Sequence, residues 1–288
     1  MEIQWALGAD IAMAFDHVVP GQAEWALAEE GMERSLRWLE RCRVRHGQLV
    51  SGVSGDSEDS GVSGVGSALS SPSAPTSSSA PTSPSAPTSP TSLTRQTLWP
   101  ILQGGTHADL RRRSLEGTLE RGPWTGMAIG GLSVGEPKPV THRVLEELEP
   151  GLPREIPRYL MGVGFPEDLV EGIARGVDLF DCVAATRNGR HGSAWTMSGR
   201  VNIRKASHRT EEQPLDPDCD CATCARFSRG YLRHLFMAQE MLGLRLVSLH
   251  NIRFLLRIGE QARAALLGGK FEHWRREWTA RYHGNGED

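Results

Sequence analysis

Short apolar segments alternate with amphipathic segments along most of this chain. Each apolar segment has the length of one strand and ends in glycine or a polar residue. Between them, apolar residues recur at the helical period; Trp25, Ala28, Met32 and Leu36, for example, fall near one face of residues 22–46. The pattern predicts strands within Leu7–Phe15, Leu98–Leu102, Met127–Ile129, Arg158–Met161 and Val177–Phe180, and helices over 22–46, Asp109–Leu119, Pro139–Leu148 and Pro166–Arg175. A repeating β-α order with short loops predicts a parallel sheet.

The residues at the strand ends indicate which parallel fold this is. Glycine there lets a ligand approach the backbone closely, and polar groups that converge from several strand ends are typical of the C-terminal face of a (β/α)8 barrel. We therefore predict an α/β protein of the (β/α)8, TIM-barrel type. A doubly wound sheet is the alternative, but no Gly-x-Gly-x-x-Gly motif follows a predicted strand and opens a helix, which argues against a dinucleotide-binding fold.

Residues 51–94 differ from the rest of the chain in composition. Ser, Gly, Pro, Thr and Ala dominate, and the unit Ser-Ala-Pro-Thr-Ser recurs. Such a segment cannot bury enough apolar surface to offset the entropy of ordering it. We predict a disordered insertion in a surface loop.

Charge and hydropathy bear on whether the chain binds nucleic acid, lies in a membrane or is secreted. The chain has 288 residues and a net charge of −3, so no overall basic field indicates a nucleic-acid partner. The local clusters Arg111-Arg112-Arg113 and Arg275-Arg276 are interpreted as solvated helix faces rather than phosphate sites. No apolar run is long enough to span a bilayer, and the first residues lack the pattern of a signal peptide. We expect a cytoplasmic protein without a membrane partner.

Three of the five cysteines lie within six residues, as Cys219, Cys221 and Cys224, and His250 follows at the end of an apolar run. Thiolates and a neutral imidazole are the ligands of a tetrahedral zinc site. The alternative is a set of buried or disulfide-bonded cysteines, but three cysteines in one tight loop cannot all pair with one another. Four protein ligands leave no position for water or substrate, so we predict one structural Zn²⁺ per chain.

The C-terminal part of the chain completes the predicted organisation. We expect a helix over Ser228–Leu242, a strand over Leu244–Leu249 that delivers His250, an amphipathic helix to about Leu267 and a basic helix over Phe271–Tyr282. The predicted divisions are a barrel part at 1–50, the insertion at 51–94, a second barrel part at 95–205, a zinc-binding subdomain at 206–252 and C-terminal helices at 253–288.

Two further groups are candidates for chemistry. Asp16 follows a predicted strand, where α/β proteins place catalytic groups, although it could equally cap the next helix. Beyond the strand-end Asp181, a turn over Thr186–Arg190 carries Arg187 and Arg190. Guanidinium groups match the oxygens of a phosphate, while the alternative is an ordinary surface turn.

Together these segments resemble the tRNA-guanine transglycosylase family. The resemblance rests on motifs in family order and covers the chain outside the Ser-rich insertion. The motifs are Phe15-Asp16, Gln103-Gly104-Gly105, Ala128 to Glu136, Tyr159 to Gly164, Phe180-Asp181-Cys182-Val183 and the Cys/His set. The resemblance implies a (β/α)8 barrel with a zinc subdomain near its C-terminal end. It also implies exchange of guanine at the wobble position of tRNAs with a GUN anticodon for a 7-deazaguanine base, by a homodimer on the route to queuosine.

The resemblance assigns a role to each matching position. Asp181 is the expected nucleophile, which attacks the ribose and forms a covalent glycosyl-enzyme as in retaining glycosidases. Asp16 is expected to accept two N–H bonds from the edge of the base. The expected contacts of the remaining positions are the base carbonyl for Gln103 and Gly104, the substituent at position seven for Gly131 and Leu132, the ring faces for Tyr159 and Met161, and anticodon phosphates for Arg187 and Arg190.

The chain departs from the family pattern at three places. The family's upstream Asp-Ser-Gly-Gly-Phe-Gln motif is absent, so we expect the chain to begin inside the barrel, which is then N-terminally incomplete. Asp16-His17-Val18 stands where bacterial members usually have Asp-Glu-Cys, whereas Val134 fits the bacterial pattern; preQ1 is favoured over queuine as the incoming base. Ala185-Thr186 replaces Pro-Thr. The alternatives to an enzyme are a non-catalytic tRNA-binding partner subunit and an inactive truncated fragment; the presence of Asp181 favours the enzyme.

Overall fold

The computed structural model describes residues 1–55 and 96–284. Its centre is a series of short parallel strands in a two-stranded and a four-stranded sheet. The strands are β1 (Ile11–Met13), β2 (Thr97–Trp99), β3 (Ile101–Leu102), β4 (Met127–Ile129), β5 (Arg158–Leu160) and β6 (Leu179–Phe180). β1 pairs with β2, and β3 to β6 pair in chain order, all in parallel. Pro100, which has no N–H to donate, separates β2 from β3. Neighbouring strands that follow chain order are the arrangement predicted for consecutive units of a (β/α)8 barrel.

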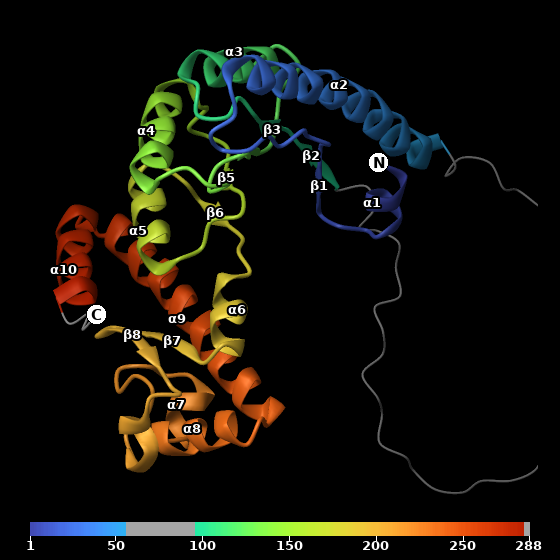
Figure 1. The fold of residues 1–288 in the computed structure, drawn as a ribbon. Coiled ribbons are helices and arrows are strands. Elements are labelled where there is room, and N and C mark those ends of the chain that lie inside the picture. The colour runs from blue at the N-terminus through green and yellow to red at the C-terminus, as the bar shows by residue number, and fades with distance from the viewer. Residues whose placement is uncertain (56–95, 285–288) are drawn as a thin grey trace, which may run out of the picture.

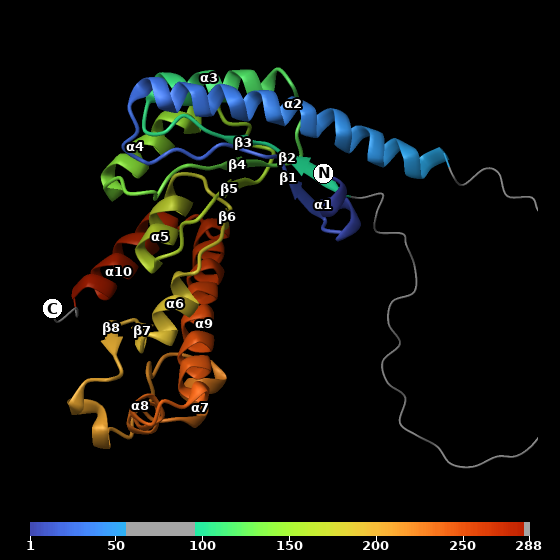
Figure 2. The same ribbon diagram turned by 45° about the vertical axis from the view of Figure 1, so that its right-hand side comes forward.

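Five helices follow the strands of this series, since β2 leads directly into β3. They are α2 (Trp25–Gly55), α3 (Ala108–Leu119), α4 (Lys138–Leu148), α5 (Pro166–Ala174) and α6 (Ala184–Arg190). Figures 1 and 2 show α2 to α5 along one face of the sheet. The largest buried cluster joins Leu102, Ile129 and Leu160 of the strands to Val144 and Leu148 of α4. Because the paired strands are parallel, their carboxyl ends lie at the same edge.

The C-terminal part is built around the long helix α9 (Met241–Leu267), which is followed by α10 (Phe271–Gly284). α9 extends from beside α5 down to a small subdomain (Figure 1). That subdomain contains the antiparallel hairpin of β7 (Ser193–Thr196) and β8 (Gly199–Asn202), with η3 (Ala206–Thr210), α7 (Ala222–Arg226) and α8 (Arg229–Met237). The remaining short helices are α1 (Glu2–Ala6) and η2 (Glu149–Gly151).

Three predictions for this region were wrong. The predicted strand Leu244–Leu249 lies inside α9, and the predicted turn Thr186–Arg190 belongs to α6. The predicted helix Ser228–Leu242 is two helices, since α8 ends at Met237 and the chain turns at Gln239, where φ is 59°. A short apolar run does not distinguish a strand from a buried helix segment.

The predicted insertion at 51–94 is outside the described residues except at its start. Residues 51–55 form the last part of α2. The β7–β8 hairpin was not predicted from the sequence.

Candidate functional site

The predicted site residues follow successive strands at the carboxyl edge of the sheet. Asp16 follows β1, Gln103 follows β3, Gly131 follows β4, Met161 follows β5 and Asp181 follows β6. Parallel strands place their carboxyl ends at the same edge, which is where open or closed βα sheets bind ligands.

Asp16 and Gln103 form a direct pair. Gln103 Nε2 donates a hydrogen bond to Asp16 Oδ2 at 2.6 Å, and the Gln103 side chain is buried. Burial raises the pKa of Asp16, and the hydrogen bond from Gln103 opposes that rise. Gln103 Oε1 has no partner among the described residues. Gln103 Oε1 is therefore a buried acceptor that lacks a protein partner beside the Asp16 carboxylate.

Gly131 is required for the close approach of the β4 loop to this pair. Its φ is 65°, a conformation that favours glycine. A Cβ at Gly131 would lie 2.3 Å from Gln103 Oε1, and one at Gly130 would lie 2.7 Å from Gln103 Nε2. The Gly130–Gly131 backbone thus packs directly against the carboxamide, with Leu132 buried behind it.

Tyr159 and Asp181 form the second pair of the site. The Tyr159 hydroxyl donates to Asp181 Oδ1 at 2.7 Å, and the Gly162 N–H donates to the same oxygen at 2.8 Å. Burial, and then the hydrogen bond and charge of Asp181, raise the pKa of Tyr159. Asp181 is exposed, and its Oδ2 has no hydrogen-bond partner in the described part of the chain. One carboxylate oxygen is therefore held in place while the other is accessible.

The structure does not join the two pairs by a direct contact. Within residues 1–55 and 96–284, no hydrogen bond connects Asp16 or Gln103 to Tyr159 or Asp181. Along the chain, the loops after β4 and β5, which carry Gly131 and the half-buried Met161, come between Gln103 and Asp181.

Arg111 is a residue of the site that sequence reasoning missed. The predicted solvated cluster is wrong at this position, because Arg111 is 1% exposed. Its guanidinium donates to four backbone carbonyls, which are Gly105 O at 2.7 Å, Leu102 O at 3.0 Å, Gly130 O at 2.8 Å and Gly131 O at 3.3 Å.

A signal for Arg111 was present in the sequence. Arg111 shares the buried face of α3 with Ser114, Leu115 and Thr118, and the three-and-four spacing of these residues marks one face of a helix. Arg112 and its neighbour Arg113 are exposed, as predicted.

Glu136 is the second missed residue, although it belongs to the Gly-rich motif. Its carboxylate accepts hydrogen bonds from the backbone N–H groups of Ser133 and Val134, the latter at 2.9 Å, and from Thr141 Oγ1 at 2.7 Å. Ser133 has a φ of 60°, which is unusual for a residue with a side chain. Glu136 thus holds the turn that follows Leu132.

Arg187 and Arg190 lie in the last turn of α6. Both are exposed, and neither guanidinium has a protein partner within the described ranges. Asn251 of α9 holds α6 in place, because its Nδ2 donates to Ala185 O at 3.0 Å and to Ser193 O at 2.9 Å. Two cations on a fixed helix are therefore available to an anionic ligand.

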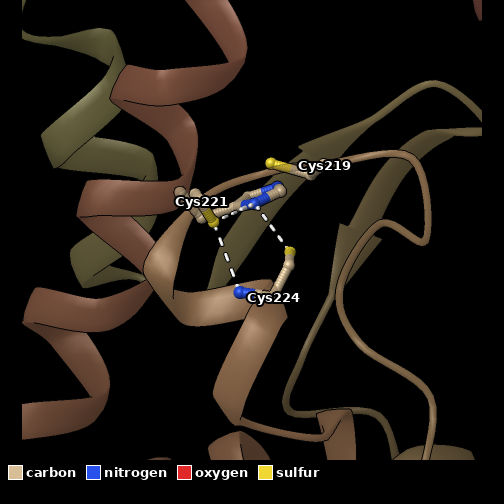
Figure 3. A group of neighbouring side chains, drawn as sticks. Cys219, Cys221 and Cys224 are labelled. Carbon is tan, nitrogen blue, oxygen red and sulfur yellow. Dashed lines mark hydrogen bonds between the residues drawn. The ribbon is translucent and has the colours of Figure 1, made fainter.

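Cys219, Cys221, Cys224 and His250 come together as predicted. Their four candidate ligand atoms lie within 4.8 Å of one another and could hold a metal ion. Figure 3 shows the three cysteine side chains converging from the loop and from the start of α7. All five cysteines are free, so the disulfide alternative is wrong.

The orientation of His250 fits a metal ligand. Its Nδ1 lies 3.3 Å from Cys224 Sγ and 3.6 Å from Cys221 Sγ. Its Nε2 lies 2.7 Å from Trp195 O, an acceptor only, so Nε2 carries the proton. Nδ1 then presents its lone pair to the thiols, and a carbonyl partner of this kind is the usual support of a ligating histidine. His250 lies on α9 rather than at the end of a strand.

The thiol environment fits the same conclusion. Hydrogen bonds among the three thiols lower the pKa of Cys221 and raise the pKa of Cys224, so the cluster by itself favours the thiolate at Cys221, and a thiolate is the form that a metal binds. Thr223 Oγ1 donates to Leu246 O at 2.8 Å, and Arg253 donates to both carboxylate oxygens of Asp220 at 2.8 and 2.7 Å. These contacts hold the cysteine loop on α9.

The fold and site define a (β/α) barrel-type protein with strand-end carboxylates and a Cys3His metal-binding cluster. The model of the family described as queuine tRNA-ribosyltransferase matches residues 1–65 and 81–284. The chain belongs to this family.

Relatives named queuine tRNA-ribosyltransferase agree with this assignment. The protein of Herpetosiphon aurantiacus is 45% identical over 280 residues, which cover 97% of this chain and 60% of the relative. Those of Symbiobacterium thermophilum and Pelotomaculum thermopropionicum are 42% and 41% identical, over 98% and 99% of this chain and 59% and 65% of the relatives. The chain therefore spans about three fifths of the length of these relatives. Within residues 1–55 and 96–284, no helix has both the length and the apolar composition that a membrane crossing needs.

Proposed function

We propose that this chain carries the base-exchange site of a tRNA-guanine transglycosylase, which replaces guanine at the wobble position with a 7-deazaguanine. The observation that carries the proposal is the placement of the Asp16–Gln103 pair and the Tyr159–Asp181 pair at one edge of the sheet. The first pair suits recognition of a base, and the second suits attack on the ribose to which that base is attached.

Base recognition is assigned to the loops after β1, β3, β4 and β5. The Asp16 carboxylate accepts the two N–H groups on the guanine edge, because an ionised carboxylate is an acceptor only. The free Nε2–H of Gln103, with the Gly104 backbone, donates to the base carbonyl. The Gly131-Leu132 backbone faces the position-seven substituent, and Tyr159 and Met161 enclose the ring.

The proposed reaction uses the difference between the two carboxylate oxygens of Asp181, of which one is held and the other is accessible. Its accessible Oδ2 attacks the anomeric carbon of the ribose; the bond from that carbon to guanine breaks, and the electron pair leaves with the base. Tyr159 and Gly162 hold Oδ1 throughout. The incoming base then attacks the same carbon through a ring nitrogen, gives up the proton of that nitrogen and expels the Asp181 carboxylate; the departing guanine takes up one proton, so the exchange is proton-neutral overall. Two displacements on one carbon retain its configuration.

The Cys219, Cys221, Cys224 and His250 set is assigned one structural Zn²⁺. Three thiolates and an imidazole fill a tetrahedral shell, so the ion has no open position for substrate. Its binding free energy contributes to folding of the zinc-binding subdomain, proposed at 206–252. Because α9 continues past residue 252, the same ion also connects this subdomain to the proposed C-terminal helices at 253–288.

The proposed substrate is a tRNA with a GUN anticodon. Arg187 and Arg190 bind anticodon phosphates, and the target nucleotide leaves its stack to enter the site. We favour preQ1 over queuine as the incoming base, because Val134 fits the sequence pattern of bacterial family members. Val18 and Val134 are both partly exposed, at 49% and 43%.

We further propose a homodimer, since Leu242, Leu249 and Leu256 are exposed on α9.

The test is exchange of radiolabelled guanine into tRNA. The chain, an Asp181→Asn variant and an Asp10→Asn control are compared; Asp10 is exposed at the opposite end of β1. We expect exchange by the chain and the control and none by Asp181→Asn. No exchange by the chain would contradict stand-alone catalysis and support the partner-subunit alternative if tRNA still binds. Equal exchange by all three would contradict the nucleophile assignment.

A further inference from the structure

Arg111 is a buried cation whose partners are all backbone carbonyls. It is 1% exposed, and no carboxylate forms an ion pair with it in the described part of the chain. Burying a charge is costly unless hydrogen bonds satisfy it. Burial lowers the pKa of Arg111 to about 10, so the group stays charged at neutral pH. A side chain retained at such a cost calls for a specific role.

The carbonyls that Arg111 binds belong to two loops of the site. Leu102 O and Gly105 O flank Gln103-Gly104 after β3. Gly130 O and Gly131 O belong to the loop after β4. A single side chain from α3 therefore connects the loop that carries the carboxamide to the loop that packs against it.

The bonds to Gly130 and Gly131 also determine where the next N–H groups point. In a trans peptide the C=O and the following N–H point in opposite directions. Arg111 holds the Gly130 and Gly131 carbonyls, so the N–H groups of Gly131 and Leu132 point away from it. Neither N–H has an acceptor among the residues that the structure describes.

The next two peptides of the loop are held from their N–H groups by Glu136. Within a few residues, the loop therefore has two carbonyls that accept hydrogen bonds from the Arg111 cation and two N–H groups that donate to the Glu136 anion. The Arg111 guanidinium can only donate hydrogen bonds and the Glu136 carboxylate can only accept them, so neither side chain can take the place of the other. The attraction between the charges of Glu136 and Arg111 supports both.

We propose that Arg111 is the positioning residue for base recognition, which aims the N–H groups of Gly131 and Leu132 and the Gln103 carboxamide at the bound purine-type base. This inference rests on the proposed base-exchange function. Arg111 does not touch the base; it acts through the peptide groups that do. A carbonyl bound to a cation also polarises its peptide, which strengthens the N–H donor.

The experiment compares Arg111→Met and Arg111→Lys with the control Arg112→Met in the full chain. Arg112 is the next residue of α3 and is exposed. Guanine affinity is measured by calorimetry, and amide hydrogen exchange is measured over residues 101–106 and 129–135. In the tRNA exchange assay, the KM for guanine and the KM for tRNA are measured separately.

We expect Arg111→Met to weaken guanine binding by about tenfold, the size of one lost hydrogen bond between a backbone N–H group and the base. It should raise the KM for guanine and not the KM for tRNA, and speed amide exchange in both loops. Arg111→Lys should be intermediate, because its ammonium keeps the charge but lacks the planar fork. Arg112→Met should match the wild type in every measurement.

The inference is overturned if folded Arg111→Met binds guanine as the wild type does, or if its loops exchange no faster. If Arg111→Met does not fold, Arg111→Lys decides by the same two readouts. A wild-type chain that binds no guanine would contradict the proposed function instead. Amide exchange would then still decide whether Arg111 orders the two loops.

Discussion

The Tyr159 hydroxyl donates a 2.7 Å hydrogen bond to Oδ1 of Asp181, the oxygen that also accepts from the Gly162 N–H. The two donors come from β5 and the loop after it, and the acceptor follows β6. Adjacent parallel strands therefore fix the orientation of the carboxylate and leave Oδ2 free. The following predictions test this arrangement and the rest of the site.

The first prediction concerns the ionisation of Tyr159. The negative charge of Asp181 disfavours a neighbouring phenolate, which contributes to the raised pKa of Tyr159. Asp181→Asn removes the charge, so the pKa of Tyr159 should fall. Spectrophotometric titration of the phenolate band measures it, and Tyr159→Phe identifies its contribution among the three tyrosines. An unchanged Tyr159 titration in Asp181→Asn would show that the hydrogen bond does not form in solution.

The second prediction separates stability from recognition at Asp16. Its folded-state pKa is raised by burial, so the folded protein favours the protonated form. The ionised carboxylate therefore costs stability at neutral pH, and that cost declines as the pH falls from the folded pKa to the lower pKa of the unfolded chain. Asp16→Asn should raise the thermal midpoint at neutral pH.

The same Asp16→Asn change should weaken guanine binding by about a hundredfold, because an amide replaces one of two charge-assisted acceptors with a donor. Calorimetry at neutral pH measures the affinity. Asp10→Asn, at an exposed carboxylate, should change neither property. Unaltered guanine affinity in Asp16→Asn would exclude Asp16 from the base site.

The third prediction concerns the metal. Cys221→Ala should lose the ion and destabilise the subdomain of α7 and α8, because Cys221 is both a proposed ligand and the N-cap of α7. Elemental analysis measures metal content and circular dichroism measures unfolding. Cys42→Ala removes a buried thiol far along the chain from the cluster and should keep one ion per chain. Full metal content in Cys221→Ala would refute the ligand assignment.

The fourth prediction concerns Arg187 and Arg190. Each should neutralise one phosphate, so replacing either by alanine should reduce the slope of log K against log salt for tRNA binding by about 0.7 to 1. Arg276→Ala, an exposed arginine on α10, is the control and should leave the slope unchanged. Equal slopes in all variants would place the tRNA elsewhere.

Local patterns were enough to predict much of the sheet. Met127–Ile129 was predicted at its exact bounds, and the strand-end positions of Asp16, Gln103 and Asp181 followed from their neighbours. The Cys219–Cys224 spacing indicated a metal site because the ligands are close in sequence. These features depend on residue period and proximity along the chain, which a sequence displays directly.

The sequence by itself determined the order of strands and helices as far as β6, the residue types at the strand ends and the composition of the metal cluster. Only the tertiary structure decided that His250 arrives on a helix, that Arg111 is buried under two loops and that Gln103 pairs with Asp16. The physical reason is that a buried polar group must find its partners wherever folding brings them. The Gln103–Asp16 partners are 87 positions apart in the chain, and no local pattern encodes such a pairing.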